Sequence, residues 1–194
     1  MPTIPTKKPA KKNSVTPVKR FTVSEFLKRR GTQGLTAKEV EMLGYVTNLD
    51  DCEVYIKRFT EQKKPIMLRF VRHIKAGLEG IIAADADDFE WKCYEALARY
   101  ETVKSKIKKR ASPSIRIRRS AKTKPLKVIL ENTVAKPPVT ESQGFISLKE
   151  FNRLDVSFEM FVLKNSDRFS DKAVANSYRR LSKAGYLKVQ TPAS

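Results

Sequence analysis

The residues best suited to chemistry in this sequence are basic, and many of them lie in one stretch. Between Lys104 and Lys127 the chain carries eleven Lys or Arg residues and no carboxylate. Such uncompensated charge can bind the phosphates of a polyanion, or it can keep a flexible linker extended by mutual repulsion. The candidate phosphate-binding residues of this stretch are Lys104, Lys106, Lys108, Lys109, Arg110, Arg116, Arg118, Arg119, Lys122 and Lys124.

The distribution of charge favours a polyanion as partner. Residues 1–20 contribute +6 and residues 104–127 contribute +11 to the formal net charge of +19, whereas residues 21–103 carry −1 and residues 128–194 carry +3. The two basic segments lack hydrophobic periodicity, so the excess points to a phosphate backbone or an anionic membrane face. Neither segment has an amphipathic anchor or a lipidation signal. We therefore expect nucleic acid as the partner and no membrane.

A group of acids offers a second possible chemistry. Asp85, Asp87, Asp88 and Glu90 could hold Mg²⁺ in a nuclease site, since clustered carboxylates are ligands for this ion. They also stand where a helix is expected to begin, and acids in a first turn complement the helix dipole. No second acidic motif offers a partner. We favour the structural interpretation of these acids.

Other catalytic arrangements are weakly supported. His73, the single histidine, has no cysteine or carboxylate at metal-ligand spacing. Tyr178 precedes Arg179 and Arg180, and a tyrosine next to arginines could indicate a tyrosine recombinase. A tyrosine in the core of a helix explains its spacing equally well. We expect a protein that is not an enzyme, with no catalytic residue, no metal and no cofactor.

Two cysteines, Cys52 and Cys93, lie on apolar faces of expected helices and indicate reduced thiols. This is consistent with a cytoplasmic or nucleoid-associated protein. The N-terminal sequence KKPAKK…VKR would also suit a nuclear localisation signal, so the protein would be nuclear if it is eukaryotic or viral.

Composition and periodicity divide the chain into four parts. Residues 1–20 are expected to be a disordered basic arm. Residues 21–107 read as a helical domain, with capping boxes at Thr22–Glu25 and Thr36–Glu39. Part of it could be a helix-turn-helix, but acids at the start of its second helix would repel phosphate, which favours two packed helices of a bundle.

The remaining parts are a linker and a second domain. Residues 108–125 are expected to form an extended basic linker. Residues 126–190 would begin with a strand at 126–131 and continue with three helices, the first of them opened by a capping box at Ser147. In the last helix, Val174, Tyr178 and Leu181 would form the buried stripe. A second strand is expected at 186–190.

The segment RFSDKAVANSYRRLSKAGYLKV resembles the recognition helix and first wing strand of a winged helix-turn-helix domain, over about residues 145–190. The resemblance implies a winged-helix-like module with a minor β component, in which the strand at 126–131 is available to pair with 186–190. It also implies that the exposed face of the last helix contacts DNA. That face is expected to carry Lys172, Asn176, Arg179, Arg180 and Lys183.

These expectations combine into a mainly α protein with two small helical modules joined by a basic linker. We expect a duplex-DNA-binding regulator or accessory factor of phage or plasmid type. Residues 104–127 contain no aromatic side chain for stacking on unpaired bases, which favours duplex DNA over RNA. The alternatives are an RNA-binding protein or RNA chaperone, and a protein-interaction scaffold with arms that bind nucleic acid nonspecifically. A protein partner or a homodimer contact would use the helical module.

Overall fold

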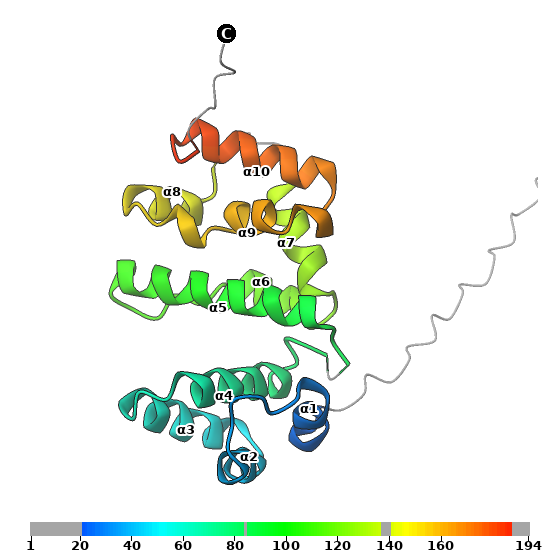
Figure 1. The fold of residues 1–194 in the computed structure, drawn as a ribbon. Coiled ribbons are helices and arrows are strands. Elements are labelled where there is room, and N and C mark those ends of the chain that lie inside the picture. Colours follow the sequence, from blue (N-terminus) through cyan, green and yellow to red (C-terminus); the bar gives the residue numbers. More distant parts are fainter. Residues whose placement is uncertain (1–20, 84, 137–140, 188–194) are drawn as a thin grey trace, which may run out of the picture.

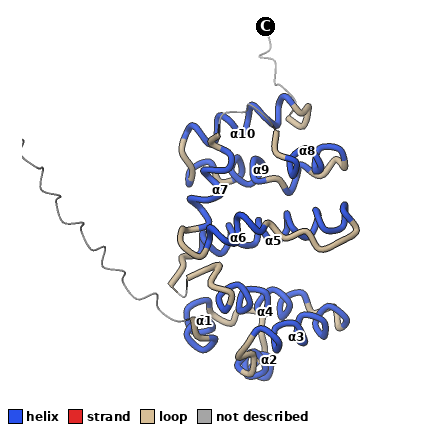
Figure 2. Tube along the Cα trace, turned by 180° about the vertical axis from the view of Figure 1, so that it is seen from behind, coloured by secondary structure: helices blue, strands red, loops and turns tan. Residues whose placement is uncertain are grey.

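A computed structural model describes residues 21–83, 85–136 and 141–187. These residues form ten α-helices and two short 3₁₀ turns, and they contain no strand. The helices are stacked in layers from α1–α4 at one end to α10 at the other (Figures 1 and 2). The prediction of a mainly α fold is confirmed. The disordered arm predicted at 1–20 lies outside the described residues.

The first layer contains four helices. They are α1 (Val23–Arg30), α2 (Ala37–Gly44), α3 (Leu49–Glu61) and α4 (Pro65–Leu78). The capping box predicted at Thr36 is present, and α3 begins with another formed by Asn48 and Asp51. At α1, Thr22 occupies the N-cap position, but its side chain makes no capping hydrogen bond. At the start of α3, Asp51 therefore has a structural role as a capping residue.

Helix α5 (Asp88–Lys108) lies between this layer and the C-terminal helices. Two of the acidic residues near its start, Asp87 and Glu90, accept backbone N–H groups at helix starts. Asp87 is the N-cap and accepts a hydrogen bond from the backbone N–H of Glu90 at 2.8 Å. The carboxylate of Glu90 accepts the N–H groups of Leu126 and Lys127, at 2.7 and 3.1 Å. The described residues hold no group of three or more acidic, histidine or cysteine side chains that could bind a metal.

The extended conformation predicted for 108–125 is wrong. Helix α5 ends at Lys108, its C-cap residue Lys109 has φ 52°, and α6 (Ile115–Ala121) follows a short loop. The loop and α6 return along α5, because Glu101 of α5 accepts the N–H of Ser114 at 2.6 Å and also binds the guanidinium of Arg118. The division of the chain into two folding modules at this segment stays a prediction.

The strand predicted at 126–131 is also wrong, because these residues belong to α7 (Leu126–Val134). Its buried residues are Leu126, Ile129, Leu130 and Val134, and this spacing follows a helix period rather than the alternation of a strand. The carboxylate of Glu90 satisfies the first N–H groups of α7. Of the second predicted strand, Tyr186 and Leu187 are not in a strand, and the other residues lie outside the described ranges.

The C-terminal layers contain α8 (Gln143–Glu150), α9 (Phe158–Lys164) and α10 (Asp171–Lys183). Short 3₁₀ turns lie at Leu154–Val156 and Ser166–Arg168. Helix α8 is capped by Ser142, so the capping box predicted at Ser147 does not start it.

The buried stripe predicted for α10 is correct at Leu181 and wrong at Tyr178, and Val174 is only partly buried. Ala173, Ser177 and Leu181 are fully buried, whereas half of Tyr178 is exposed. Small side chains let two helices approach closely, so they occupy the contact that the larger Val174 and Tyr178 were expected to fill.

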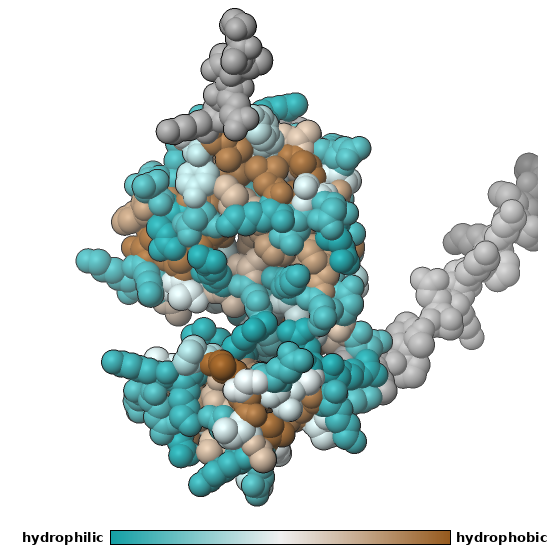
Figure 3. Space-filling model, viewed as in Figure 1, coloured by the Kyte–Doolittle hydropathy of each residue, from teal (hydrophilic) through white to brown (hydrophobic). Residues whose placement is uncertain are grey.

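An aromatic group joins α5 to the first layer. The ring of Trp91 lies 5.2 Å from that of Phe26 and 4.8 Å from that of His73, and the Tyr94 hydroxyl donates to the carbonyl of Arg72 at 3.1 Å. Burial lowers the pKa of His73, which favours its neutral form. On the outer surface a furrow with mainly hydrophilic walls separates α1–α4 from the other helices (Figure 3).

The two cysteines are buried and unbridged, as expected for reduced thiols. Burial raises the pKa of Cys52 to about 11 and that of Cys93 to about 12, so both thiols are protonated at neutral pH. Among the described helices, none combines the length and the apolar composition that a membrane span needs.

Candidate nucleic-acid interface

Eight of the ten basic residues predicted in the 104–124 stretch are exposed, and we call them the basic surface. They come from the last turn of α5, the loop after it, α6 and the turn after α6. None of them forms an ion pair with a residue of the described ranges. The basic surface consists of Lys106, Lys108, Lys109, Arg110, Arg116, Arg119, Lys122 and Lys124.

Local structure holds these cations together. The loop between α5 and α6 is tied back by a hydrogen bond from the N–H of Ser112 to the hydroxyl of Ser105, at 3.0 Å. On α6, Arg116 and Arg119 are three residues apart, so they lie on the same face of the helix. The result is a group of cations on a fixed backbone, where the sequence predicted a flexible linker.

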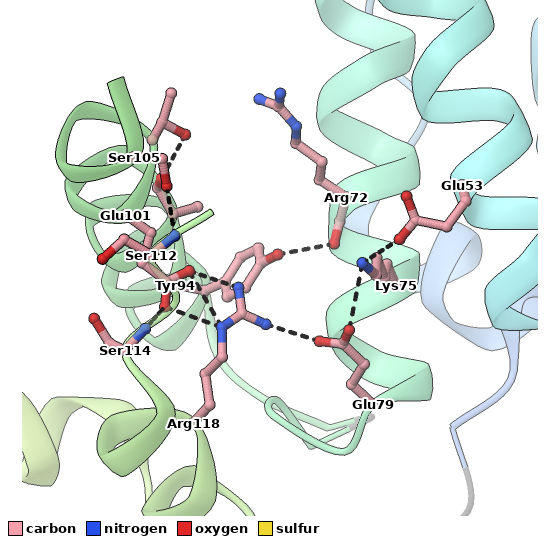
Figure 4. A network of polar contacts seen from close by, with 12 residues as sticks. Glu53, Arg72, Lys75, Glu79, Tyr94, Glu101, Ser105, Ser112, Ser114 and Arg118 are labelled. Atoms are coloured by element: carbon pink, nitrogen blue, oxygen red, sulfur yellow. Dashed lines mark hydrogen bonds and ion pairs between the residues drawn. The ribbon is translucent and has the colours of Figure 1, made fainter. Parts of the chain in front are cut away.

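The guanidinium of Arg118 points toward Glu101 and Glu79 (Figure 4), whereas the adjacent Arg119 is exposed. Its guanidinium binds Glu101 of α5 at 2.6 Å and Glu79, the residue after α4, at 2.9 Å. The hydrogen bond to Glu101 is the main reason that the pKa of Arg118 is raised. The side chain of Glu101 is only 9 % exposed, so Arg118 compensates a nearly buried charge.

The network extends beyond Arg118. Lys75 of α4 contacts Glu79 at 3.5 Å and also pairs with Glu53 of α3 (Figure 4). Four helices, α3 to α6, are therefore connected through one chain of charges. Within this chain Arg118 holds α6 in place and does not face a ligand.

Lys104 is half-buried at the edge of the basic surface. Its ammonium group lies 5.6 Å from the ring centroid of Tyr100. Burial, and then the charge of Lys108, lower the pKa of Lys104. The ring partly replaces the water that the ammonium group loses.

The basic residues predicted on α10 divide into two groups. Lys172, Arg179 and Lys183 are exposed, as expected. They are separated from the basic surface, because α10 and α6 lie on opposite sides of the layer formed by α7 and α9 (Figures 1 and 2). The structure does not bring the two predicted sets of cations into one patch.

The prediction that Asn176 and Arg180 share this exposed face is wrong. Asn176 is 7 % exposed, and its amide donates to the carbonyl of Ala135 at 3.0 Å. The guanidinium of Arg180 pairs with Glu159 at 3.0 Å and donates to the carbonyl of Lys136 at 2.8 Å. The last carbonyls of a helix lack partners within it, so both side chains serve to dock α10 on the end of α7.

A cleft that the sequence did not predict lies between α6 and α8, and we call it the α6–α8 cleft. Its volume is about 760 Å³. Four basic residues contribute to its walls: Lys104, Arg116, Lys136 and Arg180. Helices α5 to α10 all contribute lining residues, so no local pattern in the sequence could have indicated it. Lys136 in particular is an isolated cation between two predicted elements.

A second hollow lies on the outside of α9 and α10. It is shallow, and it is lined by Leu163, Val174, Ala175 and Tyr178 together with Arg179. Apolar residues gather on the surface over α10 (Figure 3). The residues predicted as the core stripe of α10 thus contribute partly to its outer surface.

Comparison of the chain with protein-family models, with curated proteins and with solved structures finds no match to any of them.

Proposed function

We propose that this protein binds duplex DNA without catalysing a reaction, as a regulator or accessory factor of phage or plasmid type, in the cytoplasm or on the nucleoid. The observation that supports this most is the basic surface. Eight exposed cations stand on α5, α6 and the adjoining loops, and no described carboxylate pairs with any of them.

The physical reason is counterion release. DNA carries condensed cations, and each phosphate contact with a protein lysine or arginine frees some of them. A side-chain cation that is already paired with a carboxylate contributes less binding free energy from this exchange. Unpaired lysine and arginine side chains therefore contribute most to DNA binding. Residues 104–127 have no aromatic side chain, so contact with the DNA backbone is favoured over stacking on bases.

We also propose that α10 recognises the DNA sequence. In a winged-helix-like arrangement α10 would enter the major groove, with Arg179 on base edges and Lys172 and Lys183 on phosphates. Asn176 and Arg180 are left out of this contact because they dock α10 on α7. The described residues provide no strand for a wing, so base reading is assigned to the helix alone.

Charge neutralisation tests the proposal. We expect a variant with Arg116, Arg119 and Lys122 all replaced by Gln to bind every duplex more weakly. Its logarithmic salt dependence should become shallower by about one unit for each phosphate that the variant no longer neutralises. Fluorescence anisotropy of a labelled duplex over a range of salt concentrations measures both effects.

The matched control replaces Lys38, Lys57 and Arg58 by Gln. These residues are exposed on α2 and α3 and pair with no described carboxylate. Their replacement removes the same net charge as the triple substitution in the basic surface. We expect the control to retain nearly the full salt dependence. Equal slopes for the two triple variants would show that only the total charge matters and that the basic surface is not the site.

The apolar surface of α10 supports a second candidate, a protein-interaction scaffold. Tyr178 is 50 % exposed beside Val174 and Ala175, and an exposed apolar group of this kind is typical of a protein contact. In that case the cations would bind nucleic acid nonspecifically and α10 would bind a protein.

A further inference from the structure

We propose that the α6–α8 cleft binds one phosphate-bearing nucleotide, at the end of a DNA strand whose duplex is held on the basic surface. This inference depends on the proposed function and adds a preference for strand ends.

The charges of the cleft suit a phosphate. Its four basic residues face two carboxylates, Glu141 and Glu159. Glu159 is paired with Arg180 at 3.0 Å, and burial raises its pKa. The cleft therefore keeps an excess of positive charge, and Arg116 can offer a phosphate two parallel donors.

The walls of the cleft also suit the rest of a nucleotide. Tyr100 and Phe158, whose ring centroids are 4.6 Å apart, line the cleft, and Ser142 and Thr133 line it too. Apolar surface with a few polar groups is typical of small-ligand sites, which measure about 300–1,000 Å³. The observed volume of about 760 Å³ falls in this range.

The cleft adjoins the basic surface, so it could receive the end of a strand from a duplex bound there. Arg116 belongs both to the basic surface and to the wall of the cleft, and residues 113–117, from the end of the loop before α6 and the first turn of α6, line the cleft. A duplex on the basic surface would thus run directly past the opening. A base pair is wider than one nucleotide, so only an unpaired nucleotide could enter.

An acidic peptide is the competing occupant, since carboxylates also pair with lysine and arginine. The choice of a nucleotide depends on the adjoining basic surface, which is suited to a continuous phosphate backbone. Poly-glutamate is therefore included as a competitor in the experiment.

The experiment compares two duplexes, one blunt and one with a short 5′-phosphorylated overhang, by anisotropy with the full chain. We expect the overhang duplex to bind about tenfold more tightly. Lys136→Glu, at the wall of the cleft, should remove this preference while leaving blunt-duplex binding largely intact. The control Lys149→Glu makes the same charge change on an exposed residue of α8 outside the cleft and should keep the preference.

Gln143→Trp provides a second test, because this exposed residue lines the cleft and a bulky ring there should block it. Deoxyadenosine monophosphate and deoxyadenosine are the small probes. Competition by the monophosphate alone would show that a free nucleotide suffices, and competition only by the overhang duplex would show that the strand is needed. Both outcomes support a nucleotide site.

The inference is overturned if wild type binds blunt and overhang duplexes equally, and the proposed function then still stands. It is also overturned if poly-glutamate binds the cleft and this binding is lost in Lys136→Glu, while neither the overhang duplex nor deoxyadenosine monophosphate competes with it. If no duplex binds at low salt, the proposed function fails, and the inference fails with it.

Discussion

Two adjacent arginines on α6 have different surroundings. Arg119 is exposed in the basic surface, whereas Arg118 is held between Glu79 and Glu101. A one-residue step on a helix rotates a side chain by about 100°, so neighbours on a short helix need not share a function. The carboxylate that captures Arg118 is seventeen residues earlier in the chain.

This difference predicts a separation of effects. Arg118→Met should destabilise the fold by about 2–4 kcal/mol, because it leaves Glu101 nearly buried without a counter-charge. Arg119→Met should change the free energy of unfolding by less than about 0.5 kcal/mol and should weaken DNA binding instead. Urea denaturation compares their stabilities. Similar stabilities for the two variants would contradict the structural role of Arg118.

For single residues, the sequence predicted the chemical character of the candidate site better than it predicted which side chains are exposed. The positive charge of 104–124 was evident, and eight of its ten candidates are exposed. The predicted exposure of Asn176 and Arg180 is wrong, because the larger apolar side chains Val174 and Tyr178 do not mark the buried face of α10. On α10 the close approach of α9 selects Ala173 and Ser177 for the contact, so polar neighbours become buried too.

The helical structure of α6 and α7 could not be predicted from the local sequence pattern. The isoleucines of SIRIRRS alternate with basic residues, and LKVILE is rich in β-branched residues, so both patterns suit a strand or an extended chain. Contacts with α5 stabilise both segments as helices rather than as strands. Glu101 accepts the N–H of Ser114 at the start of α6, and Glu90 accepts the first N–H groups of α7. Of the three capping boxes predicted from the sequence, the one at Thr36 is present, whereas Thr22 makes no capping hydrogen bond and Ser147 does not start α8.

Helix α8 offers a test of how closely it is docked on α5. A Cβ added to Gly144 would overlap the hydroxyl oxygen of Tyr100. We expect Gly144→Ala to cost about 1–3 kcal/mol of unfolding free energy, although alanine favours a helix. In a Tyr100→Phe background, where the hydroxyl is absent, part of this cost should disappear. Thermal or urea denaturation of the four proteins of this cycle measures the coupling.

Gly44→Ala is the control for that cycle. Gly44 also lies in a helix, but nothing stands within 4 Å of its added Cβ. The control should be neutral or slightly stabilising. A Gly144→Ala variant as stable as Gly44→Ala would show that α8 and α5 are not in close contact.

The whole molecule is a stack of helices, with the basic surface on its middle layer and the exposed cations of α10 at one end (Figures 1 and 2). Hydrophobic periodicity in the sequence predicted a mainly helical protein, and the charge distribution predicted its concentrated positive charge. The α6–α8 cleft and the Arg118 network depend on contacts between elements far apart in the sequence, so a single sequence could not supply them.

The central claim is that this molecule binds nucleic acid, with duplex DNA preferred. Competition binding of labelled duplex DNA against unlabelled duplex DNA, single-stranded DNA and structured RNA, at a low and a high salt concentration, tests it most directly. We predict that duplex DNA competes best and that affinity falls steeply with salt, as phosphate contacts require. A better competitor in single-stranded DNA or RNA would contradict the duplex preference, and absence of binding at low salt would contradict the claim itself.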